Sequence, residues 1–268
     1  MQESQSRHAS WQELLASPAA APHVVQICDN DEFLVTGVAF FAAEGLRAGA
    51  AVLLTGTQEH VRAVQRALDA AGADAAGAAR RGQLVISDAG QIAAALLAAP
   101  RIDALRFDAF FDGAVDQARA AGRFTGLRWW AEIAPLMRDQ GRAREALRLE
   151  ELADLAVRRH GVRLLCSYRL DRFDPAAYGG FLEDICCRHS HVIPAEDYVR
   201  HRLAVNRAIA EVLGEIRGPL LQSLLSWKGL GCDLPSSQAL LFWVRETVPE
   251  RFEEVLSLVK AHQLRQSA

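Results

Sequence analysis

Three consecutive polar residues, Asp29, Asn30 and Asp31, follow an apolar run that reads HVVQIC. Carboxylate and amide oxygens at such close spacing are ligands that hard divalent cations prefer. The same residues are also typical of a helix start, where side-chain oxygens accept hydrogen bonds from free backbone N–H groups and acids interact favourably with the helix dipole. Two interpretations stay open: a turn that binds a ligand or a cation, or a helix cap.

A second group of candidate ligand-binding residues lies in later apolar runs. Glu132 closes the run GLRWWAE, which also contains Arg128 and Trp130, and Tyr168 ends a later run. Open α/β sheets bind ligands at the carboxyl ends of their strands, so an acid in this position could line a pocket. The alternative is that both tryptophans of the run, on opposite faces of a sheet, belong to the core and that Glu132 pairs with an arginine.

Four residues with metal-ligand side chains lie within six positions: Cys186, Cys187, His189 and His191. Zinc sites usually take their ligands from two pairs that a longer loop separates, and four ligands this close would strain tetrahedral geometry. The spacing favours a helix end with a hydrogen-bonded histidine, with metal binding or a redox or pH response as the alternatives. The five cysteines, an odd number in mostly apolar stretches, predict buried free thiols.

The sequence does not contain the common catalytic motifs. A triphosphate-binding loop reads G-x-x-x-x-G-K-[ST], because glycine amides cradle the phosphates and the lysine neutralises them. After its first apolar run this chain reads CDNDEF, and its only lysines are Lys228 and Lys260, far downstream. No G-x-S-x-G nucleophile motif occurs either. We therefore expect no catalytic residues, no cofactor and no enzymatic activity.

Short apolar runs alternate with longer amphipathic segments, which predicts an α/β fold with a mainly parallel sheet between helices. Five strands are expected, at 23–28, 51–56, 83–87, 126–132 and 162–168. Helices are expected near 31–47, 59–71, 103–121, 142–160 and 175–188. The predicted α/β domain spans 23–195, after a flexible tail at 1–22.

Beyond Pro194 the composition becomes helical, which predicts a dimerisation or interaction module at 196–268. Two apolar stripes at i, i+3, i+4, i+7 spacing predict a helical hairpin joined by the turn-forming stretch GLGCDLPSS. These candidate dimerisation residues are Ile209, Val212, Leu213 and Ile216 in the first stripe, and Phe252, Val255, Leu256 and Val259 in the second. The α/β domain or another protein could cover the same stripes.

The segment GEIRGPL at 214–220 resembles the phosphoacceptor box of histidine kinases, with Gly214 where the histidine would stand. This resemblance implies a degenerate dimerisation region that has lost its phosphate acceptor. The alternative is a simple helix break at Gly218 and Pro219.

Several segments, in their order and spacing, resemble one known family. They are HVVQICDNDEFLVTGVAFFAAEGL at 23–46, GLRWWAEI at 126–133, LLCSYRLDRF at 164–173 and RHSHVI at 188–193. Together they resemble the MEDS sensory domain of methanogen and methylotroph regulators, over roughly residues 23–195. The resemblance implies a RecA/KaiC-like fold and a role in signal input.

Charge and composition narrow the function further. The formal net charge is −3, and residues 196–268 contain nine acids and nine bases, so direct nucleic-acid binding has no electrostatic support. No apolar run approaches the roughly 18 residues of a membrane span, and the start of the chain does not resemble a signal peptide, so we expect a cytoplasmic protein without membrane partners.

The expected function is non-catalytic signal sensing in a bacterial signal transduction or transcriptional regulatory pathway. The expected partners are a small-molecule ligand, a second copy of the chain in a homodimer, or a partner signalling protein. Degenerate nucleotide binding and thiol or metal sensing are the alternatives.

Overall fold

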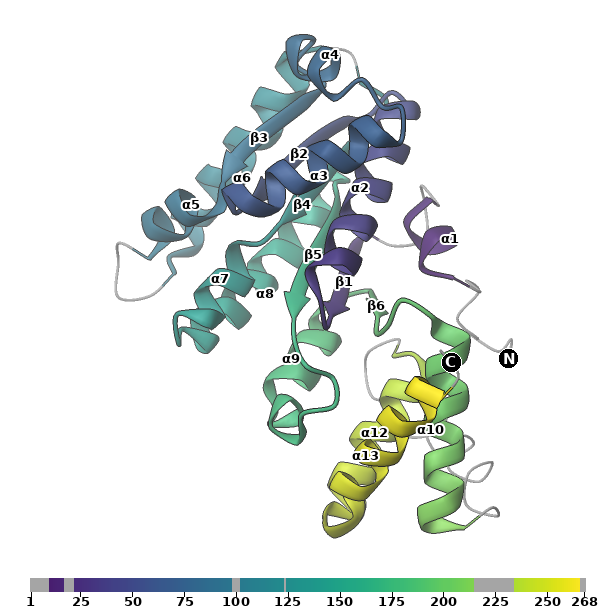
Figure 1. Cartoon of the computed structure of the whole chain (residues 1–268). Helices are drawn as coiled ribbons and strands as arrows, with labels where there is room; N and C mark the ends of the chain where they lie inside the picture. Colours follow the sequence, from purple (N-terminus) through teal and green to yellow (C-terminus); the bar gives the residue numbers. More distant parts are fainter. Residues whose placement is uncertain (1–9, 17–21, 98–101, 123, 215–233, 266–268) are drawn as a thin grey trace, which may run out of the picture.

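The computed structural model describes residues 10–16, 22–97, 102–122, 124–214 and 234–265. Within these residues one parallel six-stranded sheet forms the centre, in the order β3-β2-β4-β5-β1-β6 (Figure 1). The strands are β1 (His23–Cys28), β2 (Ala51–Gly56), β3 (Leu84–Asp88), β4 (Leu127–Ala131), β5 (Arg163–Arg169) and β6 (His191–Ile193). The predicted α/β class is confirmed, and all five expected strands are present within a residue of their predicted bounds.

The predicted number of strands is wrong, because the sheet has a sixth strand at its edge. β6 pairs with β1 from Val24↔His191 to Gln26↔Ile193. A strand of three residues is too short to show an alternating or continuous apolar pattern, so its sequence gives no strand signal.

Both faces of the sheet are buried. Val25 and Ile27 of β1 belong to one apolar core and Val24 to the other, since successive side chains of a strand point to opposite faces. Trp129 and Trp130 of β4 divide in the same way, as the sequence predicted. Burial on both faces explains why the strands read as continuous apolar runs.

Helices cover each face of the sheet (Figure 1). The Trp130 face packs against α1 (Trp11–Ala16), α2 (Asp31–Arg47), α3 (Gln58–Ala70) and α4 (Ala75–Arg80). The Trp129 face packs against α5 (Ala89–Leu96), α6 (Ala104–Ala120), α7 (Ile133–Asp139), α8 (Ala143–His160) and α9 (Phe181–Arg188). The helix expected at 175–188 is two elements, since Gly180 at φ 100° separates the 3₁₀ helix η1 (Pro175–Tyr178) from α9.

Helix α8 lies on the sheet through an apolar stripe that includes Leu149, Ala153 and Val157. It ends at Gly161, which adopts the left-handed conformation (φ 65°) that commonly terminates helices. Glu150 is only 1% exposed although it is an acid. Its position beside the apolar stripe carries its carboxylate inward, onto the sheet.

Three helices of the C-terminal part are described: α10 (Tyr198–Leu213), α12 (Ser236–Thr247) and α13 (Pro249–Arg265). The pairing of α10 with α13 confirms the predicted helical pair, and α12 packs against both (Figure 1). None of the described helices has both the length and the apolar composition needed to cross a membrane.

Most of the candidate dimerisation residues are covered within the single chain. Ile209, Phe252, Val255, Leu256 and Val259 are buried, and Val212 and Leu213 pack partly buried against the same core. Ile216 and residues 215–220 of the segment GEIRGPL lie outside the described residues. Dimerisation through the stripes stays a prediction, and it would require these helices to separate.

Tyr178 of η1 joins the C-terminal helices to the α/β part. Its ring makes edge contacts with Phe252 at 5.0 Å and with Phe242 at 5.7 Å between ring centroids. The apolar core of α10, α12 and α13 is continuous with the core on the Trp129 face of the sheet. A boundary near residue 195 stays a prediction.

Candidate functional site

The strands end together at one edge of the sheet, called the carboxyl edge below. There the chain leaves two neighbouring strands toward opposite faces of the sheet. β1 leads into α2 on the Trp130 face, whereas the adjacent β5 leads into η1 and α9 on the Trp129 face. Such a reversal leaves a crevice in which open α/β sheets bind ligands. Asp29, Asn30, Asp31 and Glu132 all lie at this edge.

Glu132 is 4% exposed and is held at the edge by two neighbours. Its Oε1 lies 2.7 Å from Nδ1 of His60, and the backbone N–H of Thr57 donates to its Oε2 at 3.0 Å. The hydrogen bond with Glu132 raises the pKa of His60, and Asp31 lies on the other side of the ring, 3.6 Å from Nε2. The expectation that Glu132 pairs with an arginine is wrong, since its partner is a histidine.

Arginines from the segment at the end of β5 neutralise the two acids that follow β1. Arg172 lies 3.2 Å from Asp29, and Arg169 lies 3.1 Å from Asp31. Asn30 is the N-cap of α2, since its side-chain oxygen accepts a hydrogen bond at 2.8 Å from a backbone N–H of the first turn. The capping interpretation therefore describes Asn30, while both aspartates form ion pairs.

A pocket of about 480 Å³ lies between this edge and the helices α10 and α13. Three acids and three bases line it: Asp29, Glu196, Asp197, Arg172, Arg200 and Lys260. The Lys260 ammonium group lies 5.7 Å from the centroid of a neighbouring aromatic ring, that of Phe173. Charges of both signs beside an aromatic surface suit a small polar ligand.

A hydrogen-bonded chain leads from the pocket to a buried histidine. Arg172 donates to Oε1 of Gln263 at 3.4 Å, and the Gln263 amide donates to Nδ1 of His201 at 3.1 Å. Burial, with a smaller effect of Arg172, lowers the pKa of His201 to about 3. These hydrogen bonds connect the crevice of the sheet with α13 and α10.

Arg128 and Trp130 do not lie at the pocket, although both were predicted to bind a ligand. Arg128 is 5% exposed and donates to the carbonyl oxygens of Leu15 at 3.0 Å and Phe41 at 2.9 Å. Trp130 is fully buried, and its indole N–H donates to the hydroxyl of Ser167 at 3.2 Å. Both side chains thus hold the core of the Trp130 face together.

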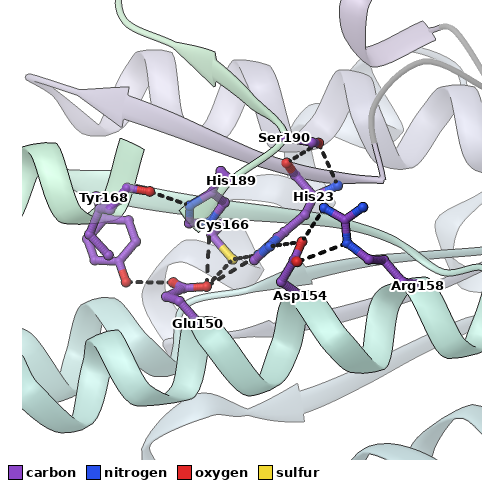
Figure 2. Close-up of polar contacts among 9 residues, drawn as sticks. His23, Glu150, Asp154, Arg158, Cys166, Tyr168, His189 and Ser190 are labelled. Carbon is purple, nitrogen blue, oxygen red and sulfur yellow. Dashed lines mark hydrogen bonds and ion pairs between the residues drawn. The ribbon is translucent and has the colours of Figure 1, made fainter. Parts of the chain in front are cut away.

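Tyr168 is also buried, and its hydroxyl donates to Glu150 at 2.6 Å inside a polar cluster on the opposite face (Figure 2). The structure therefore divides the predicted ligand-binding set. Four of its residues lie at the carboxyl edge, two support the Trp130 face, and Tyr168 belongs to the buried cluster.

The residues Cys186, Cys187, His189 and His191 do not form a common site. Cys186 is a free thiol buried in the core, His191 begins β6, and only His189 belongs to the group of potential metal ligands found among the described residues. The prediction of free thiols is wrong for Cys187, which is disulfide-bonded. The helix-end interpretation of His189 is confirmed, because it is the C-cap of α9 and its Nδ1 lies 2.8 Å from the Ile185 carbonyl oxygen.

His60 and Arg172 at the carboxyl edge, and Lys260 on the other side of the pocket, were not predicted as site residues. His60 lies in the first turn of α3, directly after β2, so its place after an apolar run is the same signal that marks the residues after β1. Arg172 belongs to the segment LLCSYRLDRF. Lys260 is remote in sequence from Asp29, and only the packing of α13 brings it to the same pocket.

A family model matches most of the chain. The family model described as MEDS, for methanogen/methylotroph, DcmR sensory domain, matches residues 22–190, which is more than half of the chain. No curated protein and no solved structure matches the chain. The matched region includes β1 to β5 and ends before β6 and the C-terminal helices.

Proposed function

The chain belongs to the MEDS family of sensory domains, and we propose that it is a non-catalytic sensor that binds a small ligand in the pocket at the carboxyl edge of its sheet. In this proposal the ligand carries both positive and negative charge. Its binding changes how α10 and α13 rest on the α/β part, and a partner signalling protein or a second copy of the chain reads that change.

The observation that carries the proposal is the shared lining of the pocket. Asp29 and Arg172 belong to the α/β part, whereas Arg200 and Lys260 belong to α10 and α13. A ligand that contacts both groups binds the closed arrangement better than the open one. Such differential binding is the physical requirement for a ligand to shift a conformational equilibrium.

Nucleotide binding without catalysis is a second candidate. Three bases line the pocket beside the aromatic ring of Phe173, and these groups can contact phosphates and a base. Against this candidate, the loop after β1 presents acids where a triphosphate requires glycine amides and a lysine. ATP therefore belongs among the compounds tested.

The test is a binding screen with the full chain. Free amino acids, dicarboxylates and ATP with and without magnesium are added singly, and the melting temperature and the heat of binding are measured. We expect at least one zwitterionic compound to raise the melting temperature. We also expect it to slow hydrogen exchange of the amides in α10 and α13.

Two variants decide whether the pocket is responsible. Lys260→Met removes a base of the pocket, and Arg62→Gln removes an exposed base of α3 as the matched control. The ligand should stabilise the Arg62 variant as it does the unmodified chain and should lose its effect on the Lys260 variant. Equal stabilisation of both variants, or no binding by any compound tested, would contradict the proposal.

A further inference from the structure

Four buried side chains with metal-ligand atoms converge on the Trp129 face of the sheet (Figure 2). They are His23 at the start of β1, Glu150 of α8, Cys166 of β5 and His189 between α9 and β6. One ligand atom from each lies within 4.8 Å of the others, and none of the four residues is more than 3% exposed. This cluster is separate from the pocket at the carboxyl edge.

Four distances within the cluster are close to those of tetrahedral coordination. Oε2 of Glu150 lies 3.3 Å from His23 Nε2, 3.5 Å from Cys166 Sγ and 3.5 Å from His189 Nε2, and Cys166 Sγ lies 3.6 Å from His23 Nε2. Zinc bonds of about 2.0–2.2 Å to N or O and about 2.3 Å to S, at tetrahedral angles, separate the ligand atoms by about 3.3–3.6 Å. These four of the six separations match those of a bound zinc ion, and the other two, both from the ligand atom of His189, lie within 4.8 Å.

The hydrogen bond of His189 directs a lone pair into the cluster. Its Nδ1 lies 2.8 Å from a backbone carbonyl oxygen, which can only accept, so Nδ1 carries the proton. In the neutral ring, Nε2 then presents a lone pair toward the Glu150 carboxylate, and this buried nitrogen has no hydrogen-bond partner among the described residues. Two acceptors that face each other in a buried space repel each other, and either a proton or a metal cation between them relieves the repulsion.

The neighbours of the cluster have the arrangement typical of metal sites. Asp154 lies 3.5 Å from Nδ1 of His23 and is itself held by Arg158 at 2.9 Å, while Tyr168 donates to the second oxygen of Glu150 (Figure 2). Histidine ligands commonly donate their other ring nitrogen to a carboxylate or carbonyl, which fixes the tautomer and the ring orientation. His189 has such a hydrogen bond, and His23 has the Asp154 carboxylate 3.5 Å from the corresponding nitrogen.

We propose that His23, Glu150, Cys166 and His189 bind a single zinc ion. Two imidazoles, a thiolate and a carboxylate are a ligand set that zinc accepts, and the charges of Cys166 and Glu150 balance the divalent ion in the buried site. Because protein ligands occupy all four positions, the ion has no open position for a substrate. Its role is to fasten β1, β5, α8 and the end of α9 together.

Zinc content of the full chain tests the proposal. Because the ligands are buried, the ion must enter during folding, so the protein is expressed or refolded with zinc alone, desalted and measured by elemental mass spectrometry. We expect one zinc per chain, and a loss of at least tenfold in the variants Cys166→Ala and His189→Ala. The variant Cys186→Ala, which removes another buried free thiol, should keep its zinc.

Cobalt keeps the test decisive if the ligand variants fail to fold. The unmodified chain refolded with cobalt should show thiolate-to-cobalt absorption and the intense visible bands of tetrahedral cobalt, and the Cys186→Ala variant should show the same spectrum. A folded protein without zinc, a cobalt spectrum without these bands, or a folded Cys166→Ala variant with full zinc content would overturn the proposal. Cysteine and glutamate would then form a metal-free network with the two histidines.

Asp154 provides a graded test, since it is a positioning residue and not a ligand. Asp154→Asn should keep the zinc stoichiometry but weaken the affinity roughly 10- to 100-fold, as measured by competition with a chelator. Asp69→Asn, an exposed change on α3, is the matched control and should leave the affinity unchanged. Equal affinity of the two variants would contradict the proposed arrangement around His23.

Discussion

Acidification should destabilise the protein through His201, and the variant His201→Gln should remove this part of the pH dependence. The imidazole is 1% exposed, and burial lowers its pKa to about 3. Glutamine retains a side-chain amide that can hydrogen-bond with Gln263 but does not titrate. The comparison between the two proteins therefore isolates the charge of one side chain.

The size of the effect follows from the difference in pKa between the two states. In the unfolded chain the imidazole has its ordinary pKa of 6.5, so between pH 6.5 and about 3 the unfolded state binds a proton that the folded state does not. The free energy of unfolding therefore falls as the pH falls, by up to about 1.4 kcal/mol per pH unit. Between pH 8 and pH 5 the loss from His201 amounts to about 2 kcal/mol.

Urea unfolding at pH 8 and at pH 5 measures this loss. The unmodified chain should lose about 2 kcal/mol more between the two values than His201→Gln does, because the other titrating groups contribute equally to both. Gln263→Leu, which removes the hydrogen-bond partner but keeps the imidazole, should retain the steep dependence. If the unmodified chain and His201→Gln show the same difference between pH 8 and pH 5, the assignment of a buried neutral histidine is refuted.

Two further substitutions, one of them with a matched control, test the packing that positions the sites. Gly37→Ala should destabilise the protein by about 1–3 kcal/mol in thermal or urea unfolding, because the added Cβ would lie 2.4 Å from the Gln26 amide. Gly113→Ala, the control on α6 with open space around it, should stabilise the protein by up to about 1 kcal/mol. Equal effects of the two substitutions would contradict the packing at Gly37. Tyr178→Ala should lower the free energy of unfolding by about 3–5 kcal/mol and speed hydrogen exchange of the amides in α12 and α13, since it removes the edge contacts with Phe252 and Phe242. Unchanged exchange would show that other contacts hold these helices.

The sheet was predictable because burial on both faces leaves a local signal. Runs such as AVLLTG are apolar throughout, and the segments between them have the helical period, so each element can be recognised within a dozen residues. β6 leaves no such signal in three residues. Helices α1, α4, α5 and α7 were missed as well, since all four are short and α7 contains Pro135. The expectation of a flexible tail at 1–22 is wrong for α1, whose Leu15 is fully buried against the Trp130 face.

The carboxyl edge was predictable only in part. Asp29 and Glu132 were found because each follows a strand, and the ends of parallel strands meet at one edge. Their partners were not found, because Arg172 and Lys260 reach the pocket through loop and helix packing, which has no spacing rule. The cysteines and histidines close to His189 in sequence carry no information about the side chains of β1, α8 and β5 that surround it in space.

The buried cluster shows why local spacing could not have found the zinc site proposed for it. His189 is surrounded by cysteine and histidine in sequence, yet its neighbours in space are His23 and Glu150, and Cys166 lies beside them. Glu150, an acid beside the apolar stripe of α8, is costly to bury without a partner, so it stands out from the apolar composition expected of a core. His23, a histidine at the start of a fully buried strand, is a second polar residue where an apolar one would be expected. Buried polar residues on elements that the fold must bring together are therefore the signal that would have predicted this cluster, and they require a model of the topology before they can be combined.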